Sequence, residues 1–379
     1  MNDETRAAPA KRPPYSAGAE SAPTHGQPGN DSETFPQNLD RMALAAPARA
    51  AVPGYEIIDE LGRGGMGVVY KARQIKLNRI VALKMVLAGG HANSVEIARF
   101  VTEAEAVAAV RHSNVIQVFD SGEANGHPYM AMEYLEWGSL AQLLRATGKL
   151  APREAAALVL KVARGVQAAH DRSIIHRDLK PHNILLEATS GAPAKARCEP
   201  KVMDFGLAKR DGAVLTVTGA LLGTPAYMAP EQARGETKKT GRAADVYSLG
   251  IVLYERLCGT VPFQGHDPWI VIQQVVNSDP EPVANRAAEV PRDLDLVCRK
   301  CLEKAPADRY ESAAALADDL QRFLNGETLH GPRTGFWHIA QRSARRRWRP
   351  VLAVFALIVL LLTAWLLPSP LEIFSRKGT

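Results

Sequence analysis

The sequence contains few cysteines, and those it has are widely separated. Four cysteines in 379 residues, at positions 198, 258, 298 and 301, are too few for a disulfide framework, which excludes a small disulfide-stabilised secreted fold. Cys298 and Cys301 have the C-x-x-C spacing of redox and zinc sites. They fall in an apolar-rich helical pattern, Leu294–Leu302, with no second Cys or His pair nearby. We therefore interpret both as small buried side chains of a protein in a reducing compartment.

Acidic residues are missing from one stretch, 331–349, which holds six arginines in nineteen residues. The formal net charge of the whole chain is +6, so the remaining residues sum to zero. The basic excess is therefore one short strip and not a broad basic face, which argues against a nucleic-acid partner.

The N-terminal residues lack both a sustained hydrophobic period and a signal peptide. Residues 1–54 are rich in Ala, Pro, Ser, Gly and Asn, and we predict that they are disordered. The start, Met1-Asn2-Asp3-Glu4, has neither the basic residues nor the apolar core of an export signal. Nothing in this segment predicts that the following residues are secreted.

Long apolar runs are also rare, and the one without any charge covers residues 351–367. At about 1.5 Å per residue, a helix of seventeen residues spans roughly 25 Å, near the lower limit for crossing a bilayer. A buried helix of a soluble domain is the alternative, but it would need a polar face, and only Thr363 is polar here. We predict one transmembrane helix, preceded by a basic juxtamembrane segment over 325–350 and followed by a short extracytoplasmic tail over 368–379.

The arginines of this chain also predict an orientation in the membrane. Five arginines lie within residues 342–349, against Arg376 and Lys377 after the apolar run. The positive-inside rule therefore predicts that the residues before the run lie in the cytoplasm, at the inner face of the plasma membrane.

Periodicity between residues 55 and 324 predicts an α+β fold with two parts. The predicted strands are Tyr55–Leu61, Val68–Gln74, Ile80–Val86, Val115–Ser121 and Tyr129–Tyr134, with a helix over Asn93–Val110. Helical periods dominate after about Trp137. We expect a small β-rich part over about 55–135 and a larger helical part over about 136–324, with a surface loop at 187–200.

The most informative motif is His-Arg-Asp-Leu-Lys-Pro-His-Asn at residues 176–183, followed by Asp-Phe-Gly at 204–206. Asp178 is a carboxylate suited to accept a hydroxyl proton, and Lys180 can neutralise phosphate charge. Asn183 and Asp204 supply oxygen ligands for magnesium. These are the groups that phosphoryl transfer requires.

A glycine-rich turn upstream adds a phosphate-binding element. Residues 61–70 fit G-x-G-x-x-G-x-V, with Leu61 before Gly62, Gly64 and Gly67. A dinucleotide-binding turn shares the glycines, but there a helix follows, whereas here the next residues form a predicted strand. No G-x-x-x-x-G-K-[ST] motif is present.

Lys84 lies in the strand after this turn, in Val81-Ala82-Leu83-Lys84, with Ala82 on the same face. Glu103 falls in the apolar stripe of the predicted helix over 93–110, where an unpaired charge is costly. We favour an ion pair between Lys84 and Glu103 over a solvated Glu103.

Together these motifs resemble the eukaryotic-type (Hanks-type) Ser/Thr protein kinases, and in style their bacterial, membrane-anchored members. The resemblance covers roughly residues 55–324 and implies the two-lobed kinase fold, with ATP and Mg²⁺ as cofactors. It implies that Lys84 contacts the α- and β-phosphates, and that Val69 and Ala82 pack on adenine. The backbones of Glu133 and Leu135 would bond the adenine edge, with Met132 behind the pocket.

The resemblance also assigns the segment between Asp204 and Glu231 as an activation segment. Its candidate phosphorylation sites are Thr216 and Thr218, which could pair with Arg177. Glu231 and Arg309 match a buried structural ion pair of the family, and Asp245 matches a brace beneath the catalytic loop.

The expected activity is phosphorylation of Ser and Thr residues in unknown protein substrates. A homodimer that phosphorylates itself in trans is compatible with the sequence. A membrane-bound pseudokinase scaffold is the main alternative, although such proteins usually lack Lys84, Asp178 or Asp204, and all three are present. A small-molecule phosphotransferase of related fold is a second alternative. It should lack the Ala-Pro-Glu at 229–231 and Arg309, and this chain has both.

Overall fold

The structure is a computed structural model, and it describes seven parts of the chain. They are residues 52–64, 67–86, 102, 104–188, 198–205, 224–236 and 240–331. Several predictions lie outside these residues: the disordered N-terminal segment as far as residue 51, Glu103, Gly206, Thr216, Thr218 and the apolar run at 351–367. Residues 52–54, the end of the predicted disordered segment, are described, and Val52 is buried. Within the described ranges, no helix combines the length and the apolar character needed to span a bilayer.

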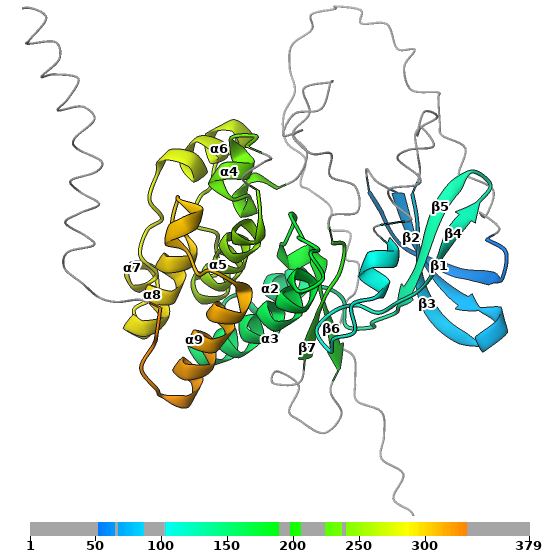
Figure 1. The fold of residues 1–379 in the computed structure, drawn as a ribbon, viewed down its shortest axis with the longest axis horizontal. Coiled ribbons are helices and arrows are strands. Elements are labelled where there is room, and N and C mark those ends of the chain that lie inside the picture. Colours follow the sequence, from blue (N-terminus) through cyan, green and yellow to red (C-terminus); the bar gives the residue numbers. More distant parts are fainter. Residues whose placement is uncertain are drawn as a thin grey trace, which may run out of the picture. The chain divides into compact units, whose positions relative to one another are not determined.

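Five antiparallel strands form one curved sheet in the order β1-β2-β3-β5-β4 (Figure 1). Their bounds are β1 Tyr55–Gly64, β2 Gly67–Gln74, β3 Arg79–Met85, β4 Val118–Ala124 and β5 His127–Glu133. All five predicted strands are therefore confirmed, with ends shifted by a few residues. Alternate residues of β2, Val68, Tyr70 and Ala72, are buried, as period-two patterning requires of a half-buried strand. We call this sheet with its connections the sheet lobe.

The β1–β2 hairpin requires glycine at its return. Gly67 has φ of +150°, and a Cβ atom there would lie 2.0 Å from the carbonyl oxygen of Met85. Only a residue without a side chain allows β2 to start this close to the end of β3. A Cβ atom at Gly62 or Gly64, by contrast, would have no other atom within 4 Å, so there is open space beside these two glycines.

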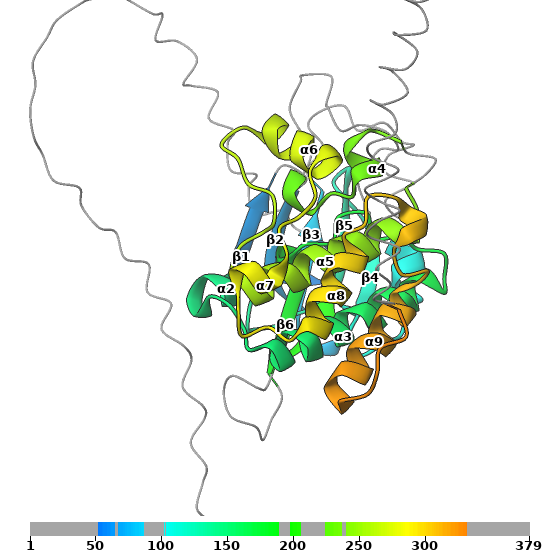
Figure 2. The ribbon, with the colours of Figure 1, turned by 90° about the vertical axis from the view of Figure 1, so that its left-hand side faces the viewer.

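The second part, the helical lobe, is built around helix α5 (Arg242–Cys258). The other main helices are α2 Leu140–Thr147, α3 Pro152–His170, α6 Pro268–Asn277, α8 Arg292–Cys301 and α9 Ala313–Asn325, with short helices α4 Pro230–Ala233 and α7 Val283–Arg286. Helices α3, α8 and α9 all contact α5, and α3 also packs on α9 (Figure 2). Fourteen residues of α5 are buried, so it is a central helix without a solvent face.

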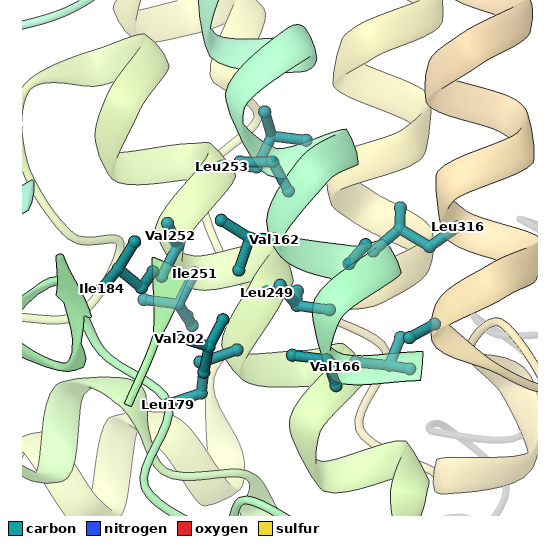
Figure 3. Close-up of a cluster of buried hydrophobic side chains, with 14 of the residues drawn as sticks. Val162, Val166, Leu179, Ile184, Val202, Leu249, Ile251, Val252, Leu253 and Leu316 are labelled. Atoms are coloured by element: carbon teal, nitrogen blue, oxygen red, sulfur yellow. The ribbon is translucent and has the colours of Figure 1, made fainter. Parts of the chain in front are cut away.

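The core of the helical lobe joins residues from distant parts of the sequence. Figure 3 shows Val162 and Val166 of α3 against Leu249 of α5 and Leu316 of α9, all fully buried. Burying a side chain of this size contributes about 1.5–3 kcal/mol. The same cluster extends to Ile184 and Val202, and so the core supports the residues that flank the catalytic motif.

The expected loop at 187–200 is partly wrong. Strands β6 (Ile184–Ala188) and β7 (Cys198–Val202) form a two-stranded antiparallel hairpin, with Glu187 opposite Glu199 and Ala188 opposite Cys198. The polar, Pro-containing sequence of β7 does not predict a strand, because the pairing of β7 depends on contacts outside the hairpin. The Nδ2 atom of Asn114, for example, donates to Pro200 O at 2.9 Å. Residues 189–197 lie outside the described part.

The structure confirms that the two cysteines of the C-x-x-C pair are buried on a helix. Both residues lie on α8 as free thiols, Cys298 1% and Cys301 0% exposed. Burial raises the pKa of each thiol, so both are protonated and unreactive at neutral pH. Across the described ranges, no group of three or more His, Cys, Asp or Glu side chains is placed to hold a metal ion.

Candidate active site

The motif at residues 176–183, which we call the catalytic loop, connects α3 to β6, and its polar side chains contact one another. Lys180 Nζ lies 3.0 Å from Asp178 Oδ2. Asn183, in the 3-10 turn η2 (Pro181–Asn183), donates from Nδ2 to Asp178 O at 2.8 Å and to Asp178 Oδ2 at 3.4 Å. The three predicted residues therefore form one cluster around the Asp178 carboxylate, which keeps a quarter of its surface exposed.

The backbone of this loop is strained at one residue, and a buried carboxylate holds it in place. Arg177 has φ of +62°, a left-handed conformation that is uncommon for a residue with a side chain. Asp245, at 1% exposure, accepts hydrogen bonds from the backbone N–H groups of His176 at 2.8 Å and Arg177 at 2.9 Å. His170 Nε2 lies 2.8 Å from the same carboxylate. The predicted brace is thus in place beneath the loop, and it stabilises an unfavourable conformation beside Asp178.

His176 connects the loop to the segment that carries Asp204. Its Nε2 lies 3.0 Å from Met203 O, and its ring packs against Phe205 with centroids 4.8 Å apart. Complete burial lowers the pKa of His176, so the ring is neutral at pH 7. The Met203 N–H donates to Asn183 O at 2.9 Å, which brings Asn183 next to the residues before Asp204.

Lys84 and Asp204 bring the two lobes together at the site. Lys84 Nζ, from β3, lies 2.6 Å from Asp204 Oδ1, and the side chains are 13% and 27% exposed. Asp204 has φ of +60°, a second left-handed residue at the site. The predicted partner of Lys84, Glu103, lies outside the described residues, so that pairing stays a prediction.

The predicted nucleotide-binding residues lie along β1, β2, β3 and the end of β5. Leu61 is 44% exposed at the hairpin. Val69 of β2 pairs with Lys84 in the strand register, and Ala82 pairs with Met132 of β5. Glu133 ends β5, and Leu135 follows it, partly buried against the core. These residues thus lie on neighbouring strands and the connection to the helical lobe.

The predicted structural pair is buried and fully hydrogen-bonded. Arg309 donates from Nη1 to Glu231 Oε1 at 2.8 Å and from Nη2 to Glu231 Oε2 at 2.7 Å. Its remaining donors bond the carbonyl oxygens of Ala243, Glu303 and Lys304. The pair fixes α4, at the end of the predicted activation segment, to the helical lobe.

Sequence reasoning missed several contacts around the site. Lys201 of β7 pairs with Glu133 at 2.6 Å and Glu187 at 3.2 Å. Burial disfavours the charged lysine, but these two carboxylates outweigh it and raise the Lys201 pKa. Gln232 Nε2 also donates to Arg177 O at 2.9 Å, which ties α4 to the catalytic loop. No local pattern signals these pairs, because their members are 14 to 68 residues apart in the chain.

Comparison with known proteins agrees with this geometry. The protein kinase domain family matches residues 55–320. The serine/threonine-protein kinase PknB of Mycobacterium leprae is 39% identical over 285 residues, which cover 74% of this chain and 44% of that protein. The probable serine/threonine-protein kinase PknB of Corynebacterium glutamicum is 36% identical over 290 residues, with 74% and 43% covered. The chain therefore spans less than half the length of these curated relatives.

Solved structures show the same fold. A crystal structure of a mutant Mycobacterium tuberculosis PknI kinase domain aligns with a TM-score of 0.57 and 26% sequence identity. The alignment covers 73% of this chain and 98% of the PknI chain. A second PknI mutant structure aligns with a TM-score of 0.59, over 74% of this chain and 99% of that one.

Proposed function

Because this chain belongs to the protein kinase family, we propose that it is a Ser/Thr protein kinase that transfers the γ-phosphate of ATP to protein hydroxyl groups. The observation that carries the proposal is the cluster of Asp178, Lys180 and Asn183, joined through Met203 to Asp204 and its partner Lys84. Lys180, in Asp-Leu-Lys-Pro, is the residue by which the motif resembles Ser/Thr kinases in particular. A pseudokinase scaffold has no support, since Lys84, Asp178 and Asp204 are all present.

In this proposal Asp178 acts on the acceptor. Its carboxylate takes the proton of the Ser or Thr hydroxyl as that oxygen forms a bond to the γ-phosphorus. The bond from this phosphorus to the bridging oxygen breaks, and ADP leaves with the electron pair. Lys180, 3.0 Å from Asp178, offsets the negative charge of the transferring group.

The metal ligands we assign are Asn183 and Asp204. Magnesium prefers oxygen donors and uses few protein ligands, because phosphates and water complete its shell. Both residues fit, since Asn183 uses its Nδ2 toward Asp178 and so leaves its amide oxygen for a cation. When bound, the ion would neutralise charge on the β- and γ-phosphates.

The Lys84–Asp204 ion pair supports nucleotide binding at this place. If Lys84 turns to the phosphates and Asp204 to a metal, each exchanges one partner for another of the same sign. Neither charge is then left bare in a partly buried site. We assign the rest of the ATP site to the residues that the resemblance implies: Leu61, Gly62, Gly64, Gly67, Val69, Ala82, Glu103, Glu133 and Leu135.

The sharpest test is Asp178→Asn, which keeps the size and removes the base. The chain of residues 1–379 in detergent, given labelled ATP and Mg²⁺, should phosphorylate itself or a generic protein substrate. The variant should be slower by about 10²–10⁴-fold, the usual contribution of a general base. Its melting temperature should match the wild type. Equal phosphorylation by both proteins, or none by the wild type, would exclude the mechanism.

We extend the proposal to attachment at the inner face of the plasma membrane, through one helix over residues 351–367, with the kinase domain over 55–324 in the cytoplasm. The apolar run and the arginines before it support this topology. Deleting residues 346–379 should move the protein from the membrane to the soluble fraction. Membrane residence of the truncated protein would contradict a single anchor.

Autophosphorylation within the activation segment, in trans between two copies, is the form of regulation we assign. Thr216 and Thr218 are the acceptors, and Arg177 beside Asp178 is the group that would pair with a phosphate. Converting both threonines to alanine should lower turnover, and unchanged turnover would remove this part of the proposal.

A further inference from the structure

A groove of about 810 Å³ lies in the helical lobe, at the point where the described chain ends. Residues of α8, α9 and the turn η5 (Pro306–Asp308) line it, together with His330 and Gly331. Helices α8 and α9 lie side by side there (Figure 2). No residue assigned above to catalysis or to nucleotide binding lines this groove, so it is separate from the active site.

The chain is held firmly where it enters the groove. Asp319 of α9, 2% exposed, accepts hydrogen bonds from the backbone N–H groups of His330 at 2.7 Å and Gly331 at 2.8 Å. The Tyr310 hydroxyl donates to the same carboxylate at 2.9 Å, and Lys300 Nζ donates to Gly331 O at 3.0 Å. A buried carboxylate therefore fixes the main chain at its last described residues.

Gly331 is also closely packed. A Cβ atom there would lie 2.6 Å from Asp319 Oδ2, 2.6 Å from Tyr310 Cε1 and 2.8 Å from Lys300 Nζ. Gly331 itself therefore lies inside the groove, against Asp319, Tyr310 and Lys300.

The lining of the groove has a net negative charge once the cation that is paired outside the lining is set aside. Arg309 belongs to the buried pair with Glu231, so it does not neutralise the lining. The remaining lining has four carboxylates against the cations of Lys300 and Arg322. Arg322 lies 3.4 Å from Glu327. The exposed carboxylates of Glu311 and Asp318 form no ion pair with another described residue.

The residues that come next have the complementary charge. Residues 332–349 contain six arginines and neither Asp nor Glu, and Arg333 comes two positions after Gly331. An extended chain spans about 3.3–3.6 Å per residue, so the Cα atom of Arg333 can lie no further than about 7 Å from the Cα atom of Gly331. We propose that this groove binds the arginine-rich segment 332–349 of the same chain, with Arg333 against Glu311 and Asp318.

Such binding would give the arginine-rich segment a second role, besides setting the orientation of the apolar run in the membrane. The arginines would hold the segment along the helical lobe, so the kinase domain would have a fixed orientation relative to residue 350. Since the contacts are exposed ion pairs, they would weaken as salt is raised.

Trypsin cleaves after arginine, so its rate within 332–349 reports directly on this binding. The full chain in non-ionic detergent would be compared with the double variant Glu311→Gln, Asp318→Asn. The matched control is Glu123→Gln, an exposed carboxylate on β4 in the sheet lobe. Cleavage after Arg333, Arg342 and Arg345 should be about fivefold faster in the double variant, as expected for losing two exposed ion pairs. The control should match the wild type, and melting temperatures should be equal.

Three results would overturn the proposal. Equal cleavage rates in all three proteins would mean that the groove does not hold the segment. Loss of protection on hundredfold dilution would assign the groove to the segment of a second copy. Protection that requires vesicles with anionic lipid, and is the same in the double variant, would assign the arginines to a lipid surface.

Discussion

The buried Glu231–Arg309 pair and the paired charges of the active site differ in access to water, although their distances are alike. Arg309 and Glu231 are 0% and 1% exposed at 2.7 Å. Lys84 and Asp204, at 2.6 Å, are 13% and 27% exposed, and Lys180 and Asp178, at 3.0 Å, are 19% and 25% exposed. Opposite charges in contact thus occur in two settings of one domain.

The setting decides what each pair can do. Arg309 uses all five of its N–H donors, two of them on Glu231, so nothing remains for a ligand. The active-site charges are partly exposed to solvent, and each can exchange its protein partner for a phosphate or a cation. Removing either member of the saturated buried pair would leave a buried charge without a partner, whereas the partly exposed pairs of the active site are available for chemistry.

The largest expected effect is on stability, for Arg309→Met. Removing one member of a buried pair leaves Glu231 charged and without a partner, which costs about 3–5 kcal/mol of unfolding free energy. Lys84→Met, in the more exposed pair, should change it by less than about 1 kcal/mol. Urea denaturation of both variants measures the difference. Similar losses in the two variants would show that exposure does not separate these pairs.

Much of the fold could be predicted because its signals are local. Alternation along Val68–Gln74 and the glycines before it are sufficient to predict the β1–β2 hairpin. The hairpin β6–β7 could not be predicted, because its second strand, Cys198–Val202, is polar and contains proline, and because distant residues support its pairing. Asn114 and Glu133 bond it from other parts of the chain, more than 60 positions away.

The site shows the same division. Asp178, Asn183 and Asp204 are recognisable because phosphoryl transfer demands these groups at short spacing. The left-handed backbone at Arg177 could not be predicted, because it depends on Asp245, which is 68 residues further along the chain. Local sequence therefore identifies the reacting groups, and the fold supplies the geometry that holds them.

A second prediction concerns Arg256, the converse of Arg309. Arg256 is 0% exposed, and its Nε, Nη1 and Nη2 atoms have no hydrogen-bond partner in the described part of the chain. Burial lowers its pKa to about 10, so it is still charged at pH 7. Arg256→Met keeps the apolar stem and removes the buried charge, and should raise the free energy of unfolding by about 1–2 kcal/mol.

Thermal unfolding would measure this gain as a rise in melting temperature of about 2–8 °C. Arg256→Lys, which keeps a charge at the same place, is the control and should give no gain. A lower melting temperature for Arg256→Met would reveal a partner of the guanidinium, such as a buried water, and would place Arg256 with Arg309 among the satisfied cations.

The smallest expected effect is a pH dependence that comes from His176. Its Nδ1 accepts a hydrogen bond from the Asp178 N–H at 3.3 Å, and Nε2 faces Met203 O, so the buried ring is bonded as the neutral form. Burial lowers its pKa below the usual 6.5. Near pH 6.5 the unfolded chain therefore binds a proton at His176 and the folded chain does not. The free energy of unfolding consequently falls as the pH is lowered through this value. Between pH 7.5 and 5.5 the wild type should lose about 1 kcal/mol more than His176→Gln in urea denaturation, since the other titrating groups are common to both proteins. Parallel losses in the two proteins would mean that the folded loop accepts the proton, and that the bond to Asp178 does not hold His176 neutral.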